Sequence, residues 1–572
     1  MKNWLPIVTW LPEYQRSWFR RDLIAGATIW AVLIPLALAY AAIAGVYPIV
    51  GLYTLPLALL GYAVFGGSRL LSVGPDAAVA VLSGGIVASL AVGGSEHLAL
   101  TIALALIVGV IYVLFFFLKM GWIADLVPDP VLKGFVEGIV WLTLLKQLGV
   151  LLGLELEGSP QGFFGSLIEL MKALPETQVV TMFIGLISVL ALVLIRRFAP
   201  RLPGPIIVLV GSIIVVGLLG LDEAGVAVLG EISGGLPGLG LPTGVNFDQI
   251  ITMISGALAI VVLGFTKTLP ALKRAAEKSG EPIDPDRELL AIGVSNIGAG
   301  LGGGYAVAGS LTATTVSVDS GGKSQIANLF AGVLCVVTIM FLLPLLADLA
   351  FSTLAAIIAV ALAGLSDPGY FRRLWAIKRY EFMIALAAFT GVLAFGVMPG
   401  VMIGVVLALF KLAHNIHEPT TAVVGRTPSG AFVDIDEHPE AQEIPGMLIW
   451  RQYGPLVFIN ARVLSNKLRS VVHTHEDIRV IVFDATTSAG IDSSAANALI
   501  AARDDLGAEG IDLWVANPRQ KGWNMAVAIL EAANAAIPPV FESLADAVTR
   551  FEKVSTAGVG KDGGSRSRPS KV

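Results

Sequence analysis

The sequence predicts a polytopic α-helical membrane protein with a small α/β domain toward its C-terminal end. Of the 572 residues, 55% are hydrophobic and only 14% are charged, whereas soluble domains contain about 25% charged residues. The surplus of apolar residues lies almost entirely before residue 415. After about residue 421 the apolar runs become short and alternate with polar segments, which is typical of a soluble domain of strands and helices.

About fourteen apolar runs are predicted to enter or cross the membrane, since a full span needs roughly 20 apolar residues. The third and the tenth runs are shorter than the others, and we expect them to be half-helices. The predicted limits are 22–44, 49–66, 75–92, 97–118, 131–153, 178–196, 203–220, 249–271, 288–303, 310–320, 326–347, 351–365, 381–397 and 400–415.

Basic residues predict the orientation, because Lys and Arg are enriched in cytoplasmic connections. They gather in alternate connections, and the opposite connections are acidic. The N-terminus is therefore predicted to be cytoplasmic, and an even number of spans returns the C-terminus to that side of the cell membrane. Seven spans per half place the two halves in opposite orientations, as an inverted repeat. The basic residues are Arg16, Arg20, Arg21, Arg69, Lys119, Arg196, Arg197, Arg201, Lys273, Arg274, Lys278, Arg372, Arg373, Lys378 and Arg379, and the acidic ones are Glu96, Glu155, Glu157, Glu169, Glu176, Asp222, Glu223 and Glu231.

Two stretches about 235 positions apart, 72–81 and 306–316, interrupt a hydrophobic run in the same way. Each follows a glycine-rich stop and restarts as a short segment of small residues. Backbone groups freed by such a break must be buried in protein or line a polar cavity, and matched half-helices in two repeats indicate the binding site of a transporter. Their N-termini suit an anion. The alternative is that the glycines only let helices pack closely.

The chain is predicted to divide into five parts. They are a cytoplasmic N-terminal segment (1–15), a transmembrane domain (16–420), a linker (421–440), a small α/β domain (441–553) and a disordered tail (554–572). Within the α/β domain we expect strands at 447–450, 456–459, 479–484 and 511–516, and an amphipathic helix at 493–506.

The residue types exclude several classes of function. Cys335 is the single cysteine, so the chain can form neither an internal disulfide nor a cysteine-based metal site. All six histidines lie outside the apolar runs or at their very ends, which excludes a histidine relay or metal cage within the membrane. No catalytic triad, metal-ligand cluster or phosphate loop appears in a suitable context. We therefore expect no enzymatic activity, no cofactor, no metal and no nucleic-acid partner.

A series of short motifs follows one another from about residue 16 to residue 552. In this order they resemble the sulfate permease (SulP) family of anion transporters, which is related to prestin and pendrin. The tail piece Gly490-Ile491-Asp492-Ser493-Ser494 resembles the loop that marks a STAS domain. The other motifs are Arg21-Asp22-Leu23-Ile24-Ala25-Gly26, Ile34-Pro35, Gly51-Leu52-Tyr53, Gly66-Gly67-Ser68-Arg69, Ser72-Val73-Gly74-Pro75, Pro130-Val131 with Gly134-Phe135, Arg201-Leu202-Pro203-Gly204-Pro205, Glu288-Leu289 with Gly293 and Asn296, and Gly321-Gly322-Lys323-Ser324-Gln325.

The resemblance implies a seven-plus-seven inverted repeat with a core and a gate, and a substrate held between the N-termini of spans three and ten. It also implies an elevator-like movement of the core, a homodimer in membrane lipid, and a cytoplasmic STAS domain open to a cytoplasmic partner. Substrates of the family include sulfate, bicarbonate, chloride, oxalate and C4-dicarboxylates. The expected substrate-binding residues are Tyr40, Asp76, Ala77, Ala78, Phe265, Lys267, Gly309, Ser310, Leu311 and Thr312.

Three positions depart from the family's pattern. Many members carry Gln or an acid where this chain has Leu36, and Arg where it has Ala313; Lys267 stands where span eight commonly has an acid linked to Na⁺ or H⁺ coupling. An ionisable residue within a span is a functional candidate, so we expect Lys267 to contact the anion and, with Asp76, to be a candidate for proton coupling. Alternatively, Lys267 pairs structurally with Asp76 or Glu137, or snorkels to the cytoplasmic face, and Asp76 is only a helix cap.

Other interpretations also stay open. The loop residues Asp492, Ser493 and Ser494 form either a regulatory phosphorylation site or the cap of the following helix. The leading functional prediction is a secondary active anion transporter. One alternative is a uracil/xanthine-type permease, which shares the architecture but lacks a STAS tail. Another is a voltage-responsive or scaffold protein of the same fold that does not transport.

Overall fold

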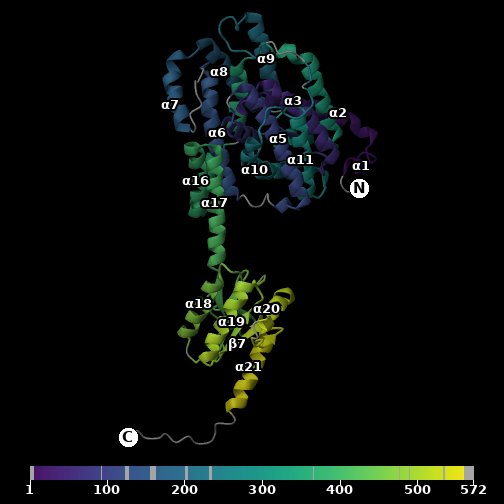
Figure 1. Cartoon of the computed structure of the whole chain (residues 1–572). Helices are drawn as coiled ribbons and strands as arrows, with labels where there is room; N and C mark the ends of the chain where they lie inside the picture. Colours follow the sequence, from purple (N-terminus) through teal and green to yellow (C-terminus); the bar gives the residue numbers. More distant parts are fainter. Residues whose placement is uncertain are drawn as a thin grey trace. The chain divides into compact units, whose positions relative to one another are not determined.

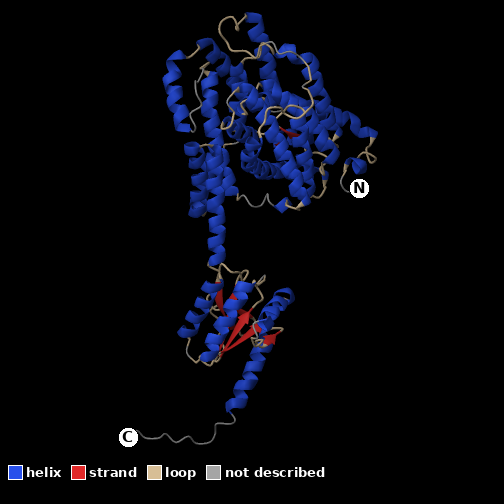
Figure 2. Ribbon diagram, viewed as in Figure 1, coloured by secondary structure: helices blue, strands red, loops and turns tan. Residues whose placement is uncertain are grey.

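The computed structural model describes residues 5–559 apart from 92, 123–127, 155–162, 200–203, 231–234, 237, 365, 476, 489 and 533–534. It divides into two compact units, Met1–Ala408 and Leu409–Val572, which are described separately. The first unit is helical, and the second contains a sheet flanked by helices (Figures 1 and 2). Several sequence predictions lie outside the described residues, namely the tail at 560–572 and the charged orientation markers Glu155, Glu157, Arg201 and Glu231.

A helix occupies each of the fourteen ranges predicted from the sequence, as expected of a polytopic membrane fold. Among the described residues, seven helical segments are long and apolar enough to cross a membrane by length and composition. The helices are α2 (Phe19–Ile43), α3 (Pro48–Phe65), α4 (Ala77–Ala88), α5 (Gly94–Phe117), α6 (Asp129–Leu151), α8 (Val179–Phe198), α9 (Gly204–Leu219), α10 (Phe247–Ser279), α11 (Pro285–Leu301), α12 (Leu311–Asp319), α13 (Ile326–Val337), α14 (Phe351–Ala363), α16 (Arg379–Phe395) and α17 (Val397–His417).

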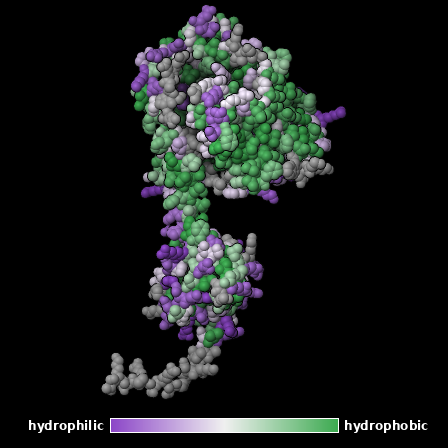
Figure 3. Space-filling view, viewed as in Figure 1, coloured by the Kyte–Doolittle hydropathy of each residue, from purple (hydrophilic) through white to green (hydrophobic). Residues whose placement is uncertain are grey.

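The outer surface of the helical unit is apolar, as contact with lipid requires. Hydrophobic residues gather over its visible face (Figure 3), and large apolar side chains such as Phe183, Ile187 and Phe341 are more than half exposed. Three short helices outside the predicted spans complete the unit: α1 (Ile7–Trp10), α7 (Phe163–Ala173) and α15 (Pro368–Ile377). A soluble domain rarely exposes so large an apolar surface, so this surface agrees with the predicted membrane location.

The helices of the first unit form two packed groups. In one group α2–α5 pack with α10–α13, and in the other α6–α9 pack with α14 and α16. Helix α17 joins the second group, because Gly400 and Gly404 bring it against Val392 on α16 and Val131 on α6. Each group therefore combines a part of the N-terminal half with the matching part of the C-terminal half. This interlocking is the arrangement expected of an inverted repeat.

The second unit is a six-stranded sheet covered by helices on both faces. The strand order is β4-β3-β5-β6-β7-β8, and β5 to β8 run parallel, whereas β3 is antiparallel to both β4 and β5. Alternate residues of β5 face opposite sides, with Trp450 in the apolar layer beneath α18 and α19 and Ile449 in the layer beneath α21. The elements are β3 (Thr421–Arg426), β4 (Phe432–Asp434), β5 (Met447–Gln452), α18 (Ala461–Thr474), β6 (Val480–Asp484), α19 (Ser493–Ala508), β7 (Asp512–Ala516), α20 (Gln520–Ala532), β8 (Val540–Phe541) and α21 (Leu544–Val559).

The structure differs from the sequence prediction of the second unit at three places. The range 421–440, expected to be a linker, contains β3 and β4, which extend the sheet. The range 456–459, expected to be a strand, forms only a single bridge between Leu456 and Ile491, because Gly454 and Pro455 interrupt the chain and a turn follows. Helix α21 continues to Val559, six residues into the range expected to be disordered.

Gly51→Ala is expected to destabilise the helical unit, because a Cβ at this position of α3 would lie 1.9 Å from the carbonyl oxygen of Ala37 on α2. Overpacking of a core costs about 1–3 kcal/mol, and a backbone oxygen has no rotamer by which to move aside. The melting temperature of the detergent-purified protein measures the effect. Gly211→Ala on α9 is the matched control, since its Cβ would meet no neighbouring atom within 4 Å; equal melting temperatures for the two variants would contradict the packing argument.

Candidate functional site

The two interrupted stretches lie side by side in the first unit. Strand β1 (Val73–Gly74) pairs antiparallel with β2 (Ala308–Gly309), with Val73 opposite Gly309. The pairing continues at Ser310, whose N–H donates to the carbonyl of Ser72 at 2.8 Å. The N–H of Ser72 in turn donates to the Thr314 hydroxyl at 3.0 Å. The breaks therefore satisfy each other's backbone groups.

Buried amide side chains hold the extended segments on either side of this pairing. Asn296 on α11 accepts a hydrogen bond from the Val307 N–H and donates one to the Val307 carbonyl, both at 2.9 Å. Gln325, just before α13, and Asn328 on α13 donate to the carbonyl of Leu71 at 2.9 and 2.8 Å. The sequence analysis did not predict these amide hydrogen bonds. The signal that could have found them is the presence of amide side chains inside otherwise apolar helices.

Helices α4 and α12 begin directly after the paired strands, and each has a side-chain cap. The Asp76 carboxylate accepts hydrogen bonds from the N–H groups of Ala78 at 2.9 Å and Val79 at 3.2 Å. The Ser310 hydroxyl oxygen accepts one from the Ala313 N–H at 3.2 Å. Both caps satisfy donors that a helix start leaves without partners in the helix. The cap interpretation of Asp76 is therefore correct, and it leaves a further role open.

The remaining donors at the two helix starts differ in exposure. The N–H groups of Ala77, Leu311 and Thr312 belong to the first helical turn and have no acceptor within their own helix. Ala77 and Ala78 are almost fully buried, at 2% and 3% exposure, whereas Leu311 is 47% exposed and Thr312 is also exposed. The start of α12 is therefore the more accessible of the two.

Lys267, on α10, forms an ion pair with Asp76. Its Nζ lies 3.4 Å from Asp76 Oδ2, and the two side chains are 15% and 21% exposed. Among the three interpretations of Lys267, the pairing with Asp76 is thus present in the structure. Glu137 is engaged elsewhere, since it accepts hydrogen bonds from the Ser366 hydroxyl at 2.5 Å and the Asp367 N–H at 3.2 Å. A partly exposed ion pair leaves the Lys267 ammonium within reach of a third group.

Thr268, next to Lys267, ties α10 to the paired strands. Its hydroxyl donates to the carbonyl of Gly264 at 2.7 Å and accepts from the N–H of Gly309 at 2.9 Å. A Cβ at position 309 would lie 2.5 Å from the Thr268 methyl carbon, so only glycine fits here. Sequence reasoning expected Gly309 in the site but missed Thr268, because a threonine in an apolar helix carries no distinguishing signal.

The two expected aromatic residues, Tyr40 and Phe265, occupy different positions, and a third aromatic residue, Tyr305, lies near Tyr40. Phe265 is fully buried in the apolar cluster that joins α4, α5 and α10, which makes it a packing residue. Tyr305 is also fully buried, and its hydroxyl donates to the Ala37 carbonyl at 3.4 Å. Tyr40 is 7% exposed, and both tyrosines lie near Asp76. Tyr40 and Tyr305 therefore border the Asp76–Lys267 pair, whereas Phe265 lies in the packing behind α4.

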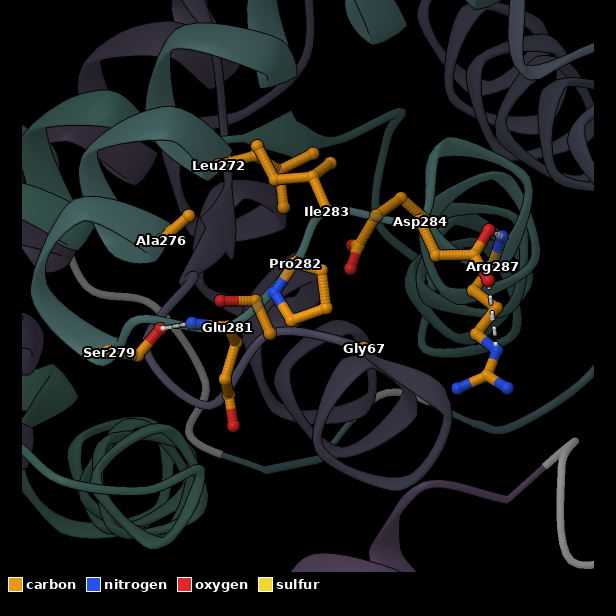
Figure 4. Close-up of a pocket in the computed structure, with 11 residues that line it drawn as sticks. Gly67, Leu272, Ala276, Ser279, Glu281, Pro282, Ile283, Asp284 and Arg287 are labelled. Atoms are coloured by element: carbon orange, nitrogen blue, oxygen red, sulfur yellow. Dashed lines mark hydrogen bonds and ion pairs between the residues drawn. The ribbon is translucent and has the colours of Figure 1, made fainter.

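A cavity of about 50 Å³ lies elsewhere in the first unit, between the connection that follows α3, the end of α10 and the start of α11 (Figure 4). It has room for a few water molecules. No residue expected in the substrate site lines it, so the candidate site depends on the paired helix starts and not on this cavity. The lining residues are Gly67, Ser68, Leu272, Ala276, Ser279, Glu281, Pro282, Ile283, Asp284, Arg287 and Glu288.

In the second unit, the predicted regulatory loop caps α19. Asp492 accepts hydrogen bonds from the N–H groups of Ala495 at 2.9 Å and Phe458 at 2.7 Å. Ser493 and Ser494 are exposed at the first two positions of the helix. The capping role is thus present in the structure, and the exposed hydroxyls remain compatible with modification.

Two family matches cover most of the chain. The sulfate permease family matches residues 19–388, and the STAS domain matches residues 438–547. The chain belongs to the sulfate permease family. It is 35% identical over 522 residues to a probable sulfate transporter of Mycobacterium tuberculosis, and this match covers 91% of the present chain and 92% of that protein. The predicted membrane fold with a C-terminal STAS domain is therefore confirmed.

Solved structures agree on the fold. A structure of SLC26A9 matches with a TM-score of 0.90 over 98% of this chain and 94% of that chain, at 22% sequence identity. The transmembrane domain of a cyanobacterial bicarbonate transporter, BicA, matches with a TM-score of 0.60 over 69% of this chain and 98% of that chain, at 26% identity. The names of two of these proteins, a probable sulfate transporter and a bicarbonate transporter, describe transporters of anions.

Thr268→Val is expected to destabilise the paired strands, because the buried N–H of Gly309 loses its acceptor while the side chain keeps its shape. Leaving such a donor unpaired costs about 1–3 kcal/mol. Hydrogen exchange of a peptide covering residues 305–312 measures the local effect as a loss of protection. Thr252→Val on the same helix is the control, since its exposed hydroxyl donates to the Asp248 carbonyl of its own helix. Unchanged protection in Thr268→Val would show that this hydrogen bond is dispensable.

Proposed function

We propose that this sulfate permease is a secondary active transporter of a small anion of the sulfate, bicarbonate or C4-dicarboxylate class, held between the N-termini of α4 and α12. The observation that carries the proposal is the β1–β2 pairing, which brings the two helix starts together beside Lys267. The names of the relatives, a sulfate transporter and a bicarbonate transporter, support the substrate class. The uracil/xanthine alternative is not proposed, because the chain belongs to another family.

The groups around this point are suited to an oxyanion. The start of α12 supplies the N–H groups of Leu311 and Thr312 together with the positive end of the helix dipole. Ser310 accepts a bond from its own helix, so its hydroxyl hydrogen remains able to donate. The Thr312 hydroxyl and the Lys267 ammonium add further donors, and Tyr40 closes the side next to Asp76. Sulfate, bicarbonate and carboxylates can all accept hydrogen bonds from backbone and hydroxyl donors. These donors therefore define a class of substrate and not one anion.

The proposed movement follows from the helix groups. Asp76, Ser310, Lys267 and Tyr40 all belong to the group of α2–α5 with α10–α13. If that group slides against α6–α9 with α14, α16 and α17, the anion travels with it as in an elevator. The contacts between the groups, mainly from α2 to α9 and α14 and from α4 to α6, would then be broken and remade. Both termini are proposed to be cytoplasmic, with the protein as a homodimer and the STAS domain open to a cytoplasmic partner.

Uptake by purified protein in liposomes tests the proposal directly. The wild type is expected to accumulate at least one anion from a competition panel of sulfate, bicarbonate, succinate, fumarate and chloride. Empty liposomes are the control for leakage. If no anion moves under any pH or Na⁺ gradient, the protein is not a transporter, and a scaffold or voltage-responsive role replaces the proposal.

A double-mutant comparison separates the two roles of Lys267. Lys267→Gln removes the ammonium but leaves Asp76 as an uncompensated negative charge, so uptake is expected to fall at least about tenfold, the equivalent of roughly 1.4 kcal/mol. Asp76→Asn with Lys267→Gln removes both charges and restores neutrality. If Lys267 contacts the anion, this double variant stays as slow as Lys267→Gln. Recovery to wild-type uptake would show that Lys267 serves only to neutralise Asp76.

A further inference from the structure

The Asp76 carboxylate already occupies the donors that an anionic substrate would use. It accepts the N–H groups of Ala78 and Val79 at the start of α4, and it pairs with the Lys267 ammonium at 3.4 Å. The side chain is 21% exposed, so the carboxylate is partly accessible. Any anion that approaches α4 or Lys267 therefore competes with a resident carboxylate.

A charge count shows which anions the site can balance. Each helix N-terminus contributes roughly half a positive elementary charge, and Lys267 and Asp76 cancel each other. The site therefore offers about one positive charge in total while Asp76 is ionised. A monoanion such as chloride or bicarbonate is balanced by this charge, whereas a dianion such as sulfate leaves about one negative charge uncompensated, which is costly inside a membrane protein.

The neighbouring elements supply no second cation among the described residues in contact with Asp76. Lys267 pairs with it from α10, and Tyr40 on α2 and Tyr305 before β2 lie near it; of these only Lys267 is a basic side chain. The position on α12 at which many family members carry an arginine is Ala313, which is fully buried. The second positive charge needed to balance a dianion therefore has to come from a change in the charge of Asp76.

We propose that Asp76 takes up one proton for each dianion carried, so that sulfate or a dicarboxylate moves together with one proton, whereas a monoanion moves with Asp76 ionised. This inference rests on the anion site proposed above. It adds two points to that site: Asp76 is the proton carrier, and the charge of the substrate decides whether a proton is carried.

The proposed step balances in charge and protons. A proton from the entry side binds Oδ2 of Asp76, and the ion pair with Lys267 breaks. The freed ammonium and the new carboxyl O–H then donate to the dianion, while Oδ1 continues to cap α4. On the other side the dianion leaves, the proton returns to solution from Oδ2, and the ion pair with Lys267 forms again. One proton and one dianion have crossed, with a net transfer of one negative charge.

Sulfate and chloride uptake into liposomes that contain a pH-sensitive dye tests this step, because neither anion changes its charge between pH 5.5 and pH 8, and fumarate serves as a second dianion. In the wild type, sulfate uptake is expected to rise by up to about tenfold per unit of external acidification and to carry one proton. Chloride uptake is expected to carry none. With the membrane potential controlled, one negative charge moves for each sulfate ion.

Asp76→Asn is the decisive variant, because asparagine still caps a helix but cannot take up the proton. Sulfate uptake in this variant is expected to lose its pH dependence and its proton, and to move two negative charges for each sulfate ion. Asp319→Asn at the other end of α12 is the matched control, since Asp319 pairs with Arg274 at 3.1 Å on an exposed surface. It is expected to behave as the wild type.

The outcomes separate this inference from the function on which it rests. Proton movement with sulfate that persists in Asp76→Asn would overturn the inference, as would a wild type whose dianion uptake is independent of pH. A wild type that carries monoanions but no dianion would overturn it as well. If none of the anions in the five-member panel moves, the failure lies with the proposed transport function.

Discussion

The helical unit depends on one constraint, that a backbone without helical hydrogen bonds cannot be left unpaired at the depth of a membrane. The chain meets this constraint by pairing its two helix breaks with each other. The Ser310 N–H donates to the Ser72 carbonyl across the pairing, and the amides of Gln325 and Asn328 in the second half donate to the Leu71 carbonyl in the first. Neither break can be satisfied without the other half of the chain, so the two halves must interlock before a stable site exists.

The same arrangement also determines the electrostatics of the site. Two helix starts brought together concentrate positive potential at one point, and this potential favours negative groups. At α4 the chain places Asp76 there, with Lys267 as its counter-ion. In the turn before α13, the fully buried carboxylate of Asp22 accepts from the N–H groups of Lys323 and Ser324 at 2.6 and 3.2 Å. The α12 start has only the neutral cap of Ser310, which leaves it as the natural position for an external anion.

Close packing holds the elements of this geometry together. Gly51 allows α3 to touch the backbone of α2, and Gly309 allows β2 to lie against Thr268 on α10. All of the charged and polar groups of the candidate site come from elements of this one helix group. A rigid group that contains the whole site can carry a bound ion without taking it apart, whereas a site shared between the two groups would have to break at each cycle.

The sequence by itself determined the features that depend on local composition. Long apolar runs specified the helices, the glycine-rich stops specified the two breaks, and the motifs specified the family. Asp76 and Asp492 were identifiable as helix caps, since a cap depends only on the residues that follow it. The partners were decided by the tertiary structure alone. Three contacts join residues that are distant in the sequence. Lys267 pairs with Asp76 and not with Glu137, Thr268 bonds to β2, and amide side chains bond to the segments beside the two breaks. The strands at 421–440 likewise form only because β5 offers them a partner edge. The spacing of residues along the chain does not predict such contacts, because they depend on how the helices and strands pack in three dimensions.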